Sequence, residues 1–404
     1  MRRLLMLVGI LAVTSFGCDV FLPSEGYYNQ PCSTGSFCEG DGLKCIGGIC
    51  KLPDEIGILY VDGDVTAGGD GASWVTAFVH PQDAMNNASQ DSEIWVAAGT
   101  YTCNSISEVS VLNMEAGVDI YGGFFGNEIN RDQRDPVRFK SILDGGIVCK
   151  HVVEGASNAI IDGFTIRGGL ADESFPHGTG GGMYNNAIGN LTVSDCIFIS
   201  NRAIYGGAIY NSDCTSITIQ HCVFVGNTAD SRGGAIETVN GDPLVKNCLF
   251  SANNAVNGAG LSMVDSAPNI MNCTFSTNDA TNSGGAIYGS ASSEFSILNS
   301  ILWGDDAVNG DEEIHMNGLP GPKVENSCIE HGYVGVGNIS SDPNFVTDDL
   351  GAFYLSHFDL QGSTSACVDA GLGTSAEHGL ADRTTRTDGI GDSDTVDMGF
   401  HFVQ

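Results

Sequence analysis

Four side chains at regular intervals could form a surface that binds sugars. Tyr184 and Tyr210 are 26 residues apart, Glu237 follows after 27 more, and Tyr288 comes two further intervals along the chain. Aromatic rings stack on the apolar faces of sugars, and a carboxylate accepts hydrogen bonds from sugar hydroxyl groups. If each interval is one turn of a regular structure, these residues share a ligand face. Tyrosine is also a frequent surface residue of β-strands, and the sequence leaves that simpler explanation open.

A second group of residues could bind a metal ion. Asp388, Asp392 and Asp394 lie in one short loop with two glycines, and oxygen-rich loops of this kind suit Ca²⁺. The spacing matches no recognised Ca²⁺ loop, however, and acidic turns are common in so negative a chain. The sequence therefore requires no cofactor and allows Ca²⁺ at these aspartates.

A row of cysteines, each preceded by a polar residue, offers two further kinds of chemistry. Thiolates in a row could bind a soft metal, but buried free cysteine acts as a small apolar core residue, and we favour that interpretation. Asp195 and His221 directly precede two of these cysteines and could form a proton-transfer dyad. A solvated polar corner is favoured over the dyad. The cysteines of the row are Cys196, Cys222, Cys248 and Cys273.

The composition argues against several classes of protein. The 404 residues include 49 acidic and only 16 basic side chains, which gives a net charge of −33. Nucleic acid is excluded as a partner, because phosphate binding needs clustered lysine and arginine. Hydrophobic residues make up 42% of the chain, which is too many for a disordered protein. The 55 glycines have no three-residue period, so they indicate a chain that turns often rather than collagen.

Two sequence motifs recur with one period in the middle of the chain. Glycine-led segments begin at Gly180, Gly206, Gly233, Gly258 and Gly284, with spacings of 26, 27, 25 and 26. Between them runs a Cys-x-Phe-x-x-Asn motif whose phenylalanines step by 26, 26 and 25. Two independent motifs that keep one period indicate stacked coils. The motif residues are Phe198, Phe224, Phe250 and Phe275, with Asn201, Asn227, Asn253 and Asn278.

The pattern within each period predicts the fold class. Short alternating strands are separated by glycine and asparagine corners, where left-handed backbone conformations are needed. Equivalent residues stacked about 4.8 Å apart would form an interior phenylalanine stack and a corner asparagine ladder, in which Asp305 takes the next asparagine position. A leucine-rich repeat fits part of the motif, but the Gly-Gly-Ala-Ile strand that follows disfavours it. The expected fold is all-β, a right-handed parallel β-helix.

The two motifs resemble the repeats of chlamydial polymorphic outer-membrane proteins and of many bacterial secreted β-helix proteins with a pectate-lyase-like solenoid. Residues 60–74 look like the first segment of that broad group, which implies a short amphipathic helix near residues 82–88 that caps the first coil. The resemblance covers roughly residues 58–404 and is specific for architecture, not for activity. Three tail segments, 342–345, 367–371 and 397–400, resemble a choice-of-anchor region.

The same solenoid also carries pectate lyases and polygalacturonases, so a polysaccharide lyase or glycoside hydrolase is the alternative function. A lyase needs carboxylates that hold Ca²⁺ and a basic residue that removes a proton, and a hydrolase needs two paired carboxylates. The basic residues of the regular coils are few, and none takes a coil-equivalent position beside an outward acid cluster. Asp305 and Asp306 resemble the paired aspartates of polygalacturonases, without that family's other motifs. Enzyme activity stays open, and a non-catalytic function is favoured. The basic residues in question are Arg202, Arg232 and Lys246.

The N-terminus has the features of an export signal. Two arginines precede an apolar run that ends before Cys18. This arrangement resembles a bacterial lipobox, which implies a lipid on Cys18; ordinary signal cleavage is the alternative. Export places thiols in an oxidising compartment, where Cys103 could pair with Cys149 and Cys328 with Cys367. A two-disulfide knot is favoured over zinc for Cys32, Cys38, Cys45 and Cys50.

The sequence predicts four regions and a role at the cell surface. We expect an exported cell-envelope lipoprotein at the outer membrane or cell surface, or a secreted protein. Its expected partners are an extracellular polysaccharide or another surface component and, through the lipid, the membrane. The expected function is non-catalytic adhesion or carbohydrate binding. The regions are a signal peptide (1–17), a Cys-rich stalk (18–55), the β-helix (56–325) and a β-rich tail or cap (326–404).

Overall fold

The chain forms two compact units, residues 1–56 and 57–404. The computed structural model describes residues 57–403 apart from 67, 104–108, 174–176, 291–292, 311–312, 319–320 and 349–350. In the first unit it describes only the backbone of two antiparallel strands, β1 (Lys44–Ile46) and β2 (Ile49–Lys51). The predicted signal peptide, Cys18 and the side chains of the four clustered cysteines lie outside the described residues.

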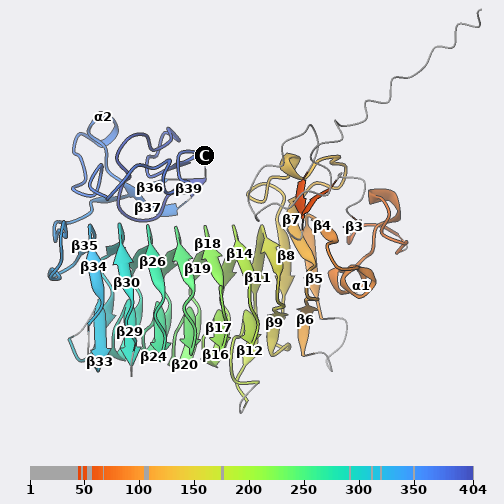
Figure 1. Cartoon of the computed structure of the whole chain (residues 1–404), viewed down its shortest axis with the longest axis horizontal. Coiled ribbons are helices and arrows are strands. Elements are labelled where there is room, and N and C mark those ends of the chain that lie inside the picture. The colour runs from red at the N-terminus through yellow and green to blue at the C-terminus, as the bar shows by residue number, and fades with distance from the viewer. Residues whose placement is uncertain are drawn as a thin grey trace, which may run out of the picture. The chain divides into compact units, whose positions relative to one another are not determined.

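The second unit is a parallel β-helix, as the two repeated motifs predict. Its strands stack into four parallel sheets that run along the length of the solenoid (Figure 1). Neighbours within a sheet are one coil apart in sequence, so that Phe198 pairs with Phe224 and Phe224 with Phe250. This register is what a 26-residue period requires, and it excludes the leucine-rich repeat.

The four sheets contain ten, nine, eight and six strands. The first is β3 (Ile58–Val61), β4 (Glu93–Ala97), β7 (Asp119–Phe124), β10 (Ala159–Asp162), β14 (Leu191–Ser194), β18 (Thr218–Gln220), β22 (Leu244–Lys246), β26 (Asn269–Met271), β30 (Ser296–Leu298) and β34 (Lys323–Glu325). The second is β5 (Gly99–Thr102), β8 (Ser141–Asp144), β11 (Phe164–Arg167), β15 (Ile197–Ile199), β19 (Val223–Val225), β23 (Leu249–Ser251), β27 (Thr274–Ser276), β31 (Ile301–Leu302) and β35 (Cys328–Ile329). The third is β6 (Ser110–Asn113), β9 (His151–Glu154), β13 (Met183–Asn186), β17 (Ile209–Ser212), β21 (Ile236–Val239), β25 (Leu261–Val264), β29 (Ile287–Ser290) and β33 (Ile314–Asn317). The fourth is β12 (Leu170–Ala171), β16 (Arg202–Tyr205), β20 (Thr228–Arg232), β24 (Asn254–Asn257), β28 (Asp279–Ser283) and β32 (Asp306–Ala307).

The core of the solenoid contains the predicted phenylalanine stack. The four rings are fully buried, and adjacent rings are nearly parallel, with centroids 5.1, 4.8 and 4.3 Å apart. Offset stacking of this kind adds to the stability gained by burying each ring. The cysteine row lies in the same core at zero exposure, and its thiols donate to backbone carbonyl oxygens.

The predicted asparagine ladder is also present. The side-chain nitrogens of Asn201, Asn227 and Asn253 each donate to the amide oxygen one coil further on, at 3.0, 3.0 and 2.9 Å. Each nitrogen also donates to a backbone carbonyl of the preceding coil, such as Phe198 O for Asn227. The ladder therefore satisfies polar groups that the tight corner buries, which strand hydrogen bonds cannot reach.

A short helix, α1 (Pro81–Asn87), lies where the resemblance implies a cap for the first coil. Pro81 occupies its first position and the side chain of His80 accepts from the amide of Gln82, which is a favourable start for a helix. Ala84 and Met85 are buried against the first coils. Two 3₁₀ turns, η2 (Trp74–Thr76) and η3 (Arg131–Gln133), interrupt the early coils, where Cys103 is bonded to Cys149.

The tail packs against the outer side of the nine-stranded sheet, in the same compact unit as the solenoid (Figure 1). Leu249 of β23 lies in one apolar cluster with Tyr354, Phe400 and Phe402 of the tail. The thiols of Cys328 and Cys367 contact each other in a second cluster. Among the described residues, no helix is long and apolar enough to cross a membrane. The tail elements are β36 (Phe345–Asp348), β37 (Gly351–Leu355), α2 (Phe358–Gln361), β38 (Arg383–Thr384) and β39 (Phe402–Val403).

Candidate functional site

The predicted ligand face lies on the outer side of the eight-stranded sheet. Tyr184 pairs with Tyr210, and Tyr210 with Glu237, in the parallel register of β13, β17 and β21. Ser262 follows on β25, and Tyr288 on β29. The structure therefore brings the four predicted residues into one row, with one residue per coil.

The side chains of this row are less exposed than the flat aromatic face that the sequence predicts. Tyr184 and Tyr288 are half-buried, whereas Tyr210 is 8% exposed and Glu237 fully buried. The ring of Tyr184 is nearly parallel to that of Tyr210, at 6.1 Å between centroids, and His151 stacks on its other side at 5.0 Å. The rings thus turn their faces to one another along the solenoid axis, because a parallel register superimposes equivalent side chains. Ring edges and hydroxyl groups, rather than open faces, are what this row presents to a ligand.

An arginine that the sequence analysis placed outside the ligand face completes it. The Nε atom of Arg232 donates to Glu237 Oε1 at 3.0 Å, and the guanidinium carbon lies 5.1 Å from the centroid of the Tyr205 ring. About one third of the Arg232 side chain is exposed. Burial raises the pKa of Glu237, although the charge of Arg232 opposes that shift. Arg232 therefore compensates the buried carboxylate and still presents donors to solvent.

The position of Arg232 follows from the glycine corner. Arg232 ends β20 five residues before Glu237, and Gly233, with a φ of +68°, turns the chain toward β21. A side chain at the end of one strand is thereby folded over the outward residue of the next. The signal in the sequence was an arginine immediately before a Gly-Gly pair, together with an acid five residues later. Arg232 and Glu237 do not occupy equivalent positions in two coils, so a search for acids and bases at equivalent positions does not find this pair.

The second half of the face is centred on Tyr288. Its ring stacks on His315 of the next coil, at 5.4 Å and 4° between planes, and its hydroxyl accepts from Asn317 Nδ2 at 3.2 Å. Tyr288 is separated from Tyr210 by two coils whose outward residues, Glu237 and Ser262, are both buried. The face therefore consists of two half-exposed aromatic groups with Arg232 between them, which suits a ligand that spans several coils.

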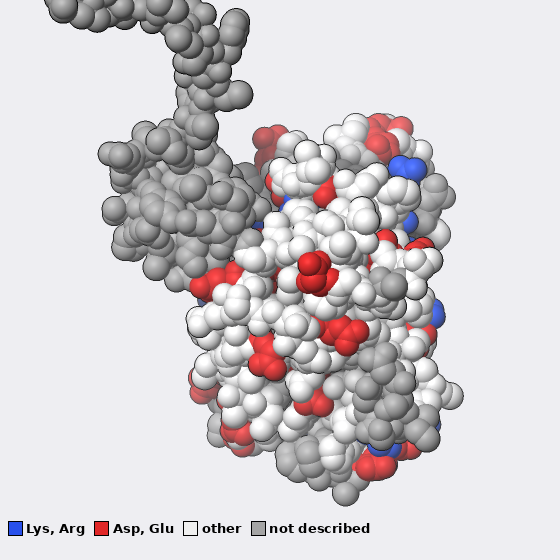
Figure 2. All heavy atoms as spheres, turned by 90° about the vertical axis from the view of Figure 1, so that its right-hand side faces the viewer, with Lys and Arg blue, Asp and Glu red and all other residues white. Residues whose placement is uncertain are grey.

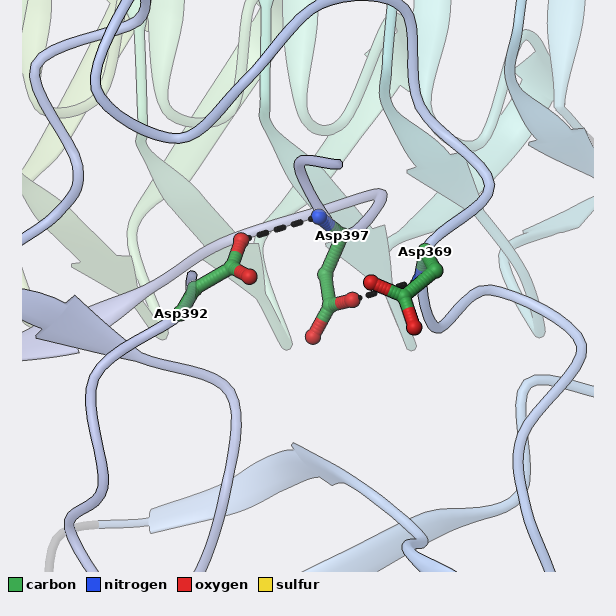
Figure 3. A group of neighbouring side chains, drawn as sticks. All are labelled: Asp369, Asp392 and Asp397. Carbon is green, nitrogen blue, oxygen red and sulfur yellow. Dashed lines mark hydrogen bonds between the residues drawn. The ribbon is translucent and has the colours of Figure 1, made fainter. Parts of the chain in front are cut away.

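The three aspartates of the predicted Ca²⁺ loop do not lie together in the structure. Asp388 pairs with Arg386, whose hydrogen bond to Asp388 holds the pKa of this carboxyl at about 2, and Asp394 is exposed. Asp392 instead lies beside Asp369 and Asp397, and one oxygen of each of these three carboxylates falls within 4.8 Å of the others (Figure 3). The structure therefore groups Asp392 with Asp397 and with Asp369 from an earlier part of the tail, and not with Asp388 and Asp394.

The hydrogen bonds of this tail cluster give it a structural role. Asp397 Oδ1 accepts from the amide of Asp369 at 2.7 Å, and Asp392 Oδ2 accepts from the amide of Asp397 at 3.0 Å (Figure 3). Asp392 also contacts Nε2 of the fully buried His401 at 2.9 Å, and the hydroxyl of Thr385 donates to Asp397. Burial and the neighbouring Asp392 raise the pKa of Asp397 to about 6. These bonds join three loops of the tail, and the oxygen-rich set is also of the type that Ca²⁺ accepts.

The tail partly covers the corner that contains Asp195 and His221, and both residues are half-buried. Arg383 Nη2 donates to Asp195 Oδ1 at 2.7 Å, and this charge lowers the pKa of Asp195 against the effect of burial. His221 lies one coil further on, and its Nδ1 atom is 3.0 Å from Asn247 Nδ2. Burial and the nearby Arg383 lower the pKa of His221 to about 4. The two residues thus lie on adjacent coils and are half-buried, and Asp195 holds the tail through Arg383.

The remaining members of this corner row make the same kind of contact. Asn247 exchanges two hydrogen bonds with the backbone of His401, at 2.9 and 2.7 Å, and Asn299 does so with Leu372, at 3.1 and 2.7 Å. All have positive φ angles, between 47° and 57°, which turns their side chains out of the corner. The row is thus a docking strip for the tail. We call it the corner strip, and it consists of Asp195, His221, Asn247, Asn272 and Asn299.

Replacing His221 with asparagine, the residue found at the next three corners, should make the protein more resistant to acid. The pKa of His221 is lowered by folding, so its contribution to stability is complete above about pH 6.5 and is lost as the pH falls toward about 4. Between these values the wild type should lose on the order of 3 kcal/mol more than His221→Asn. Urea unfolding at several pH values measures this. His331→Asn changes an exposed histidine that also has a positive φ, and an equal effect there would contradict the prediction.

The comparisons with known proteins agree with this architecture. The chain is a parallel β-helix repeat protein, and three of its segments match the Chlamydia polymorphic membrane protein repeat, at residues 195–212, 221–238 and 272–290. These segments contain the corner residue, the Phe-x-x-Asn motif and the glycine-led strand of three coils. None of the curated proteins compared with the chain matches it.

A solved structure resembles the chain in fold. The crystal structure of pectate lyase Pel9A aligns with 84% of this chain and 96% of its own, at 11% identity and a TM-score of 0.39. The activity is therefore argued from the residues of this chain.

Proposed function

We propose that the protein is an exported, non-catalytic cell-surface protein that binds extracellular polysaccharide along its eight-stranded sheet. The observation that carries this proposal is the row of Tyr184, Arg232 and Tyr288, which offers aromatic edges, hydroxyl groups and an arginine spaced along several coils of one sheet. Polar groups set between aromatic rings are typical of sites that bind sugars. The match to repeats of polymorphic membrane proteins supports a location at the outer membrane or surface, where a lipid on Cys18 would serve as the anchor.

The charge of the chain favours a neutral polysaccharide. A net charge of −33 repels polyanions, and the acidic side chains on the end of the solenoid are scattered singly, with few basic ones beside them (Figure 2). Arg232 already neutralises Glu237, so it offers hydrogen bonds more than net positive charge. An acidic polymer, the usual substrate class for a lyase, therefore meets an unfavourable field.

Replacing Tyr184 with alanine should weaken binding of a neutral polysaccharide roughly 5-fold, since an aromatic contact contributes on the order of 1 kcal/mol. Affinity electrophoresis of the purified protein in gels that contain neutral or acidic polysaccharides measures this. Phe358→Ala removes an aromatic side chain that is 72% exposed on the tail, and it should leave binding unchanged. Equal retardation of the wild type and Tyr184→Ala in every gel would eliminate this face.

The same panel tests the alternative of a polysaccharide lyase or hydrolase. Incubation of the wild type with each polymer, followed by assays for reducing ends and for unsaturated sugars, should give no release above buffer. Reproducible release that Arg232→Ala abolishes would replace binding with catalysis as the function of this face.

A further inference from the structure

The last rung of the asparagine ladder is a carboxylate. Asp305 takes the position that asparagine occupies in the four preceding coils, and it is 5% exposed. The backbone and side-chain nitrogens of Asn278 both donate to its Oδ1 atom, at 2.7 and 2.6 Å. One oxygen of Asp305 thus accepts the same pair of hydrogen bonds that the amide oxygen accepts in the preceding coils.

The other oxygen of Asp305, when ionised, cannot donate the hydrogen bond that the amide nitrogen of asparagine donates. In the preceding rung, Asn278 Nδ2 donates to the carbonyl of Phe250 at 3.0 Å. An ionised Asp305 has an acceptor at the equivalent place, and its Oδ2 atom is buried without a hydrogen-bond partner. Leaving a buried carboxylate oxygen unpaired costs free energy, unless a proton or a cation accompanies it.

A second buried carboxyl group lies against that of Asp305. Glu313 is 5% exposed, its two oxygens have no hydrogen-bond partner outside this pair, and its carboxyl group interacts directly with that of Asp305. Glu330 lies nearby and adds negative charge, while its Oε2 atom accepts from the amide of Gly304 at 2.7 Å. Among the described residues, no basic side chain forms an ion pair with Asp305 or Glu313. Three oxygens of two buried carboxylates therefore converge without a compensating charge.

From this convergence we infer that Asp305 and Glu313 form a Ca²⁺ site inside the last complete coil of the solenoid. Carboxylate oxygens are the ligands that Ca²⁺ prefers, and backbone carbonyls of a tight corner are common additional ligands. A divalent cation between the two groups turns their mutual repulsion into attraction and provides the partner that Oδ2 and both Glu313 oxygens lack. The competing explanation is that the two carboxyl groups share one proton. Addition of Ca²⁺ distinguishes these explanations, because only a Ca²⁺ site gains stability from it.

Calorimetric titration with CaCl₂ alone, after treatment with a chelator, tests the inference. The wild type should bind Ca²⁺ and gain thermal stability from it. Asp305→Asn and Glu313→Gln should each weaken that binding roughly 10-fold or more and lose the Ca²⁺-dependent rise of the melting temperature. Asp306→Asn changes the exposed neighbour of Asp305 by the same charge and should bind like the wild type.

Two further measurements keep the test decisive. In chelator, Asp305→Asn should melt at a higher temperature than the wild type, because the new amide can donate where Oδ2 cannot; this result also shows that the variant is folded. Asp369→Asn alters the tail carboxylate cluster and should leave the Ca²⁺ response intact. The inference is overturned if the wild type gains no stability from Ca²⁺, if only Asp369→Asn abolishes the response, or if the melting temperature follows pH and ignores Ca²⁺.

Discussion

Asn227→Ala is expected to lower the free energy of unfolding by about 3–5 kcal/mol, because it leaves several buried polar groups unpaired at once. The amide oxygen of Asn227 accepts from both nitrogens of Asn201, at 3.1 and 3.0 Å, and its own nitrogen donates to Phe198 O and to Asn253 Oδ1. Asn227 is fully buried, so water cannot replace these bonds. The loss therefore falls on groups in three consecutive coils.

Urea unfolding followed by circular dichroism measures the effect. Asn254→Ala provides a control of the same type, because Asn254 lies one coil further along, immediately after the ladder residue, and its exposed side chain bonds only to the carbonyl of Ala252. That change should cost less than about 0.5 kcal/mol. If the two variants unfold at the same urea concentration, the ladder does not stabilise the solenoid.

The solenoid could be predicted from the sequence because every coil must bury the same kinds of groups at the same positions. Each turn buries one ring at the Phe224 position and one corner at the Asn227 position, so the solution recurs every 26 residues or so and is visible as a period. Residues that depart from the period are harder to interpret. Asp305 was recognised as a ladder position, but Glu313, which faces it, carries no motif, and only the structure brings the two carboxylates together.

The tail could not be predicted in the same way, since it has no period. The polar residues Asp195, His221 and Asn247 were recognised as one row, but nothing in residues 326–404 indicates that the tail lies on that row. The acidic loop shows the same limit: nearness in sequence suggested Asp388 and Asp394 as partners of Asp392, whereas Asp369 contacts it through folding of the tail. Long-range contacts without a repeat leave no local signal.

The corner strip gives the solenoid a function beyond that of a scaffold, because it determines which face the tail covers. By occupying the nine-stranded sheet, the tail leaves the eight-stranded sheet, with Tyr184 and Arg232, available to ligands. Docking of the tail and exposure of the proposed ligand face are therefore two consequences of one arrangement. A variant that releases the tail should leave the solenoid folded and affect polysaccharide binding little.

Asn247→Ala is the variant that should release the tail, at a cost of about 2–4 kcal/mol. Its side chain exchanges hydrogen bonds of 2.9 and 2.7 Å with the backbone of His401, in a fully buried contact, and a further bond reaches His221. Alanine removes these bonds and also adopts the left-handed conformation of Asn247, with a φ of 47°, less readily.

Asn240→Ala separates these two effects. Asn240 has a φ of 52°, but its side chain is exposed and bonds only to Asp213, so its replacement reports the backbone strain without the docking contact. Hydrogen exchange followed by mass spectrometry should show faster exchange in tail peptides around His401 for Asn247→Ala and unchanged exchange for Asn240→Ala, with the peptides of β19 and β23 protected in both. Equal protection of the tail in the two variants would mean that apolar contacts around Phe400 and Phe402 hold it without the corner strip, because the docking energy would then come from burial alone.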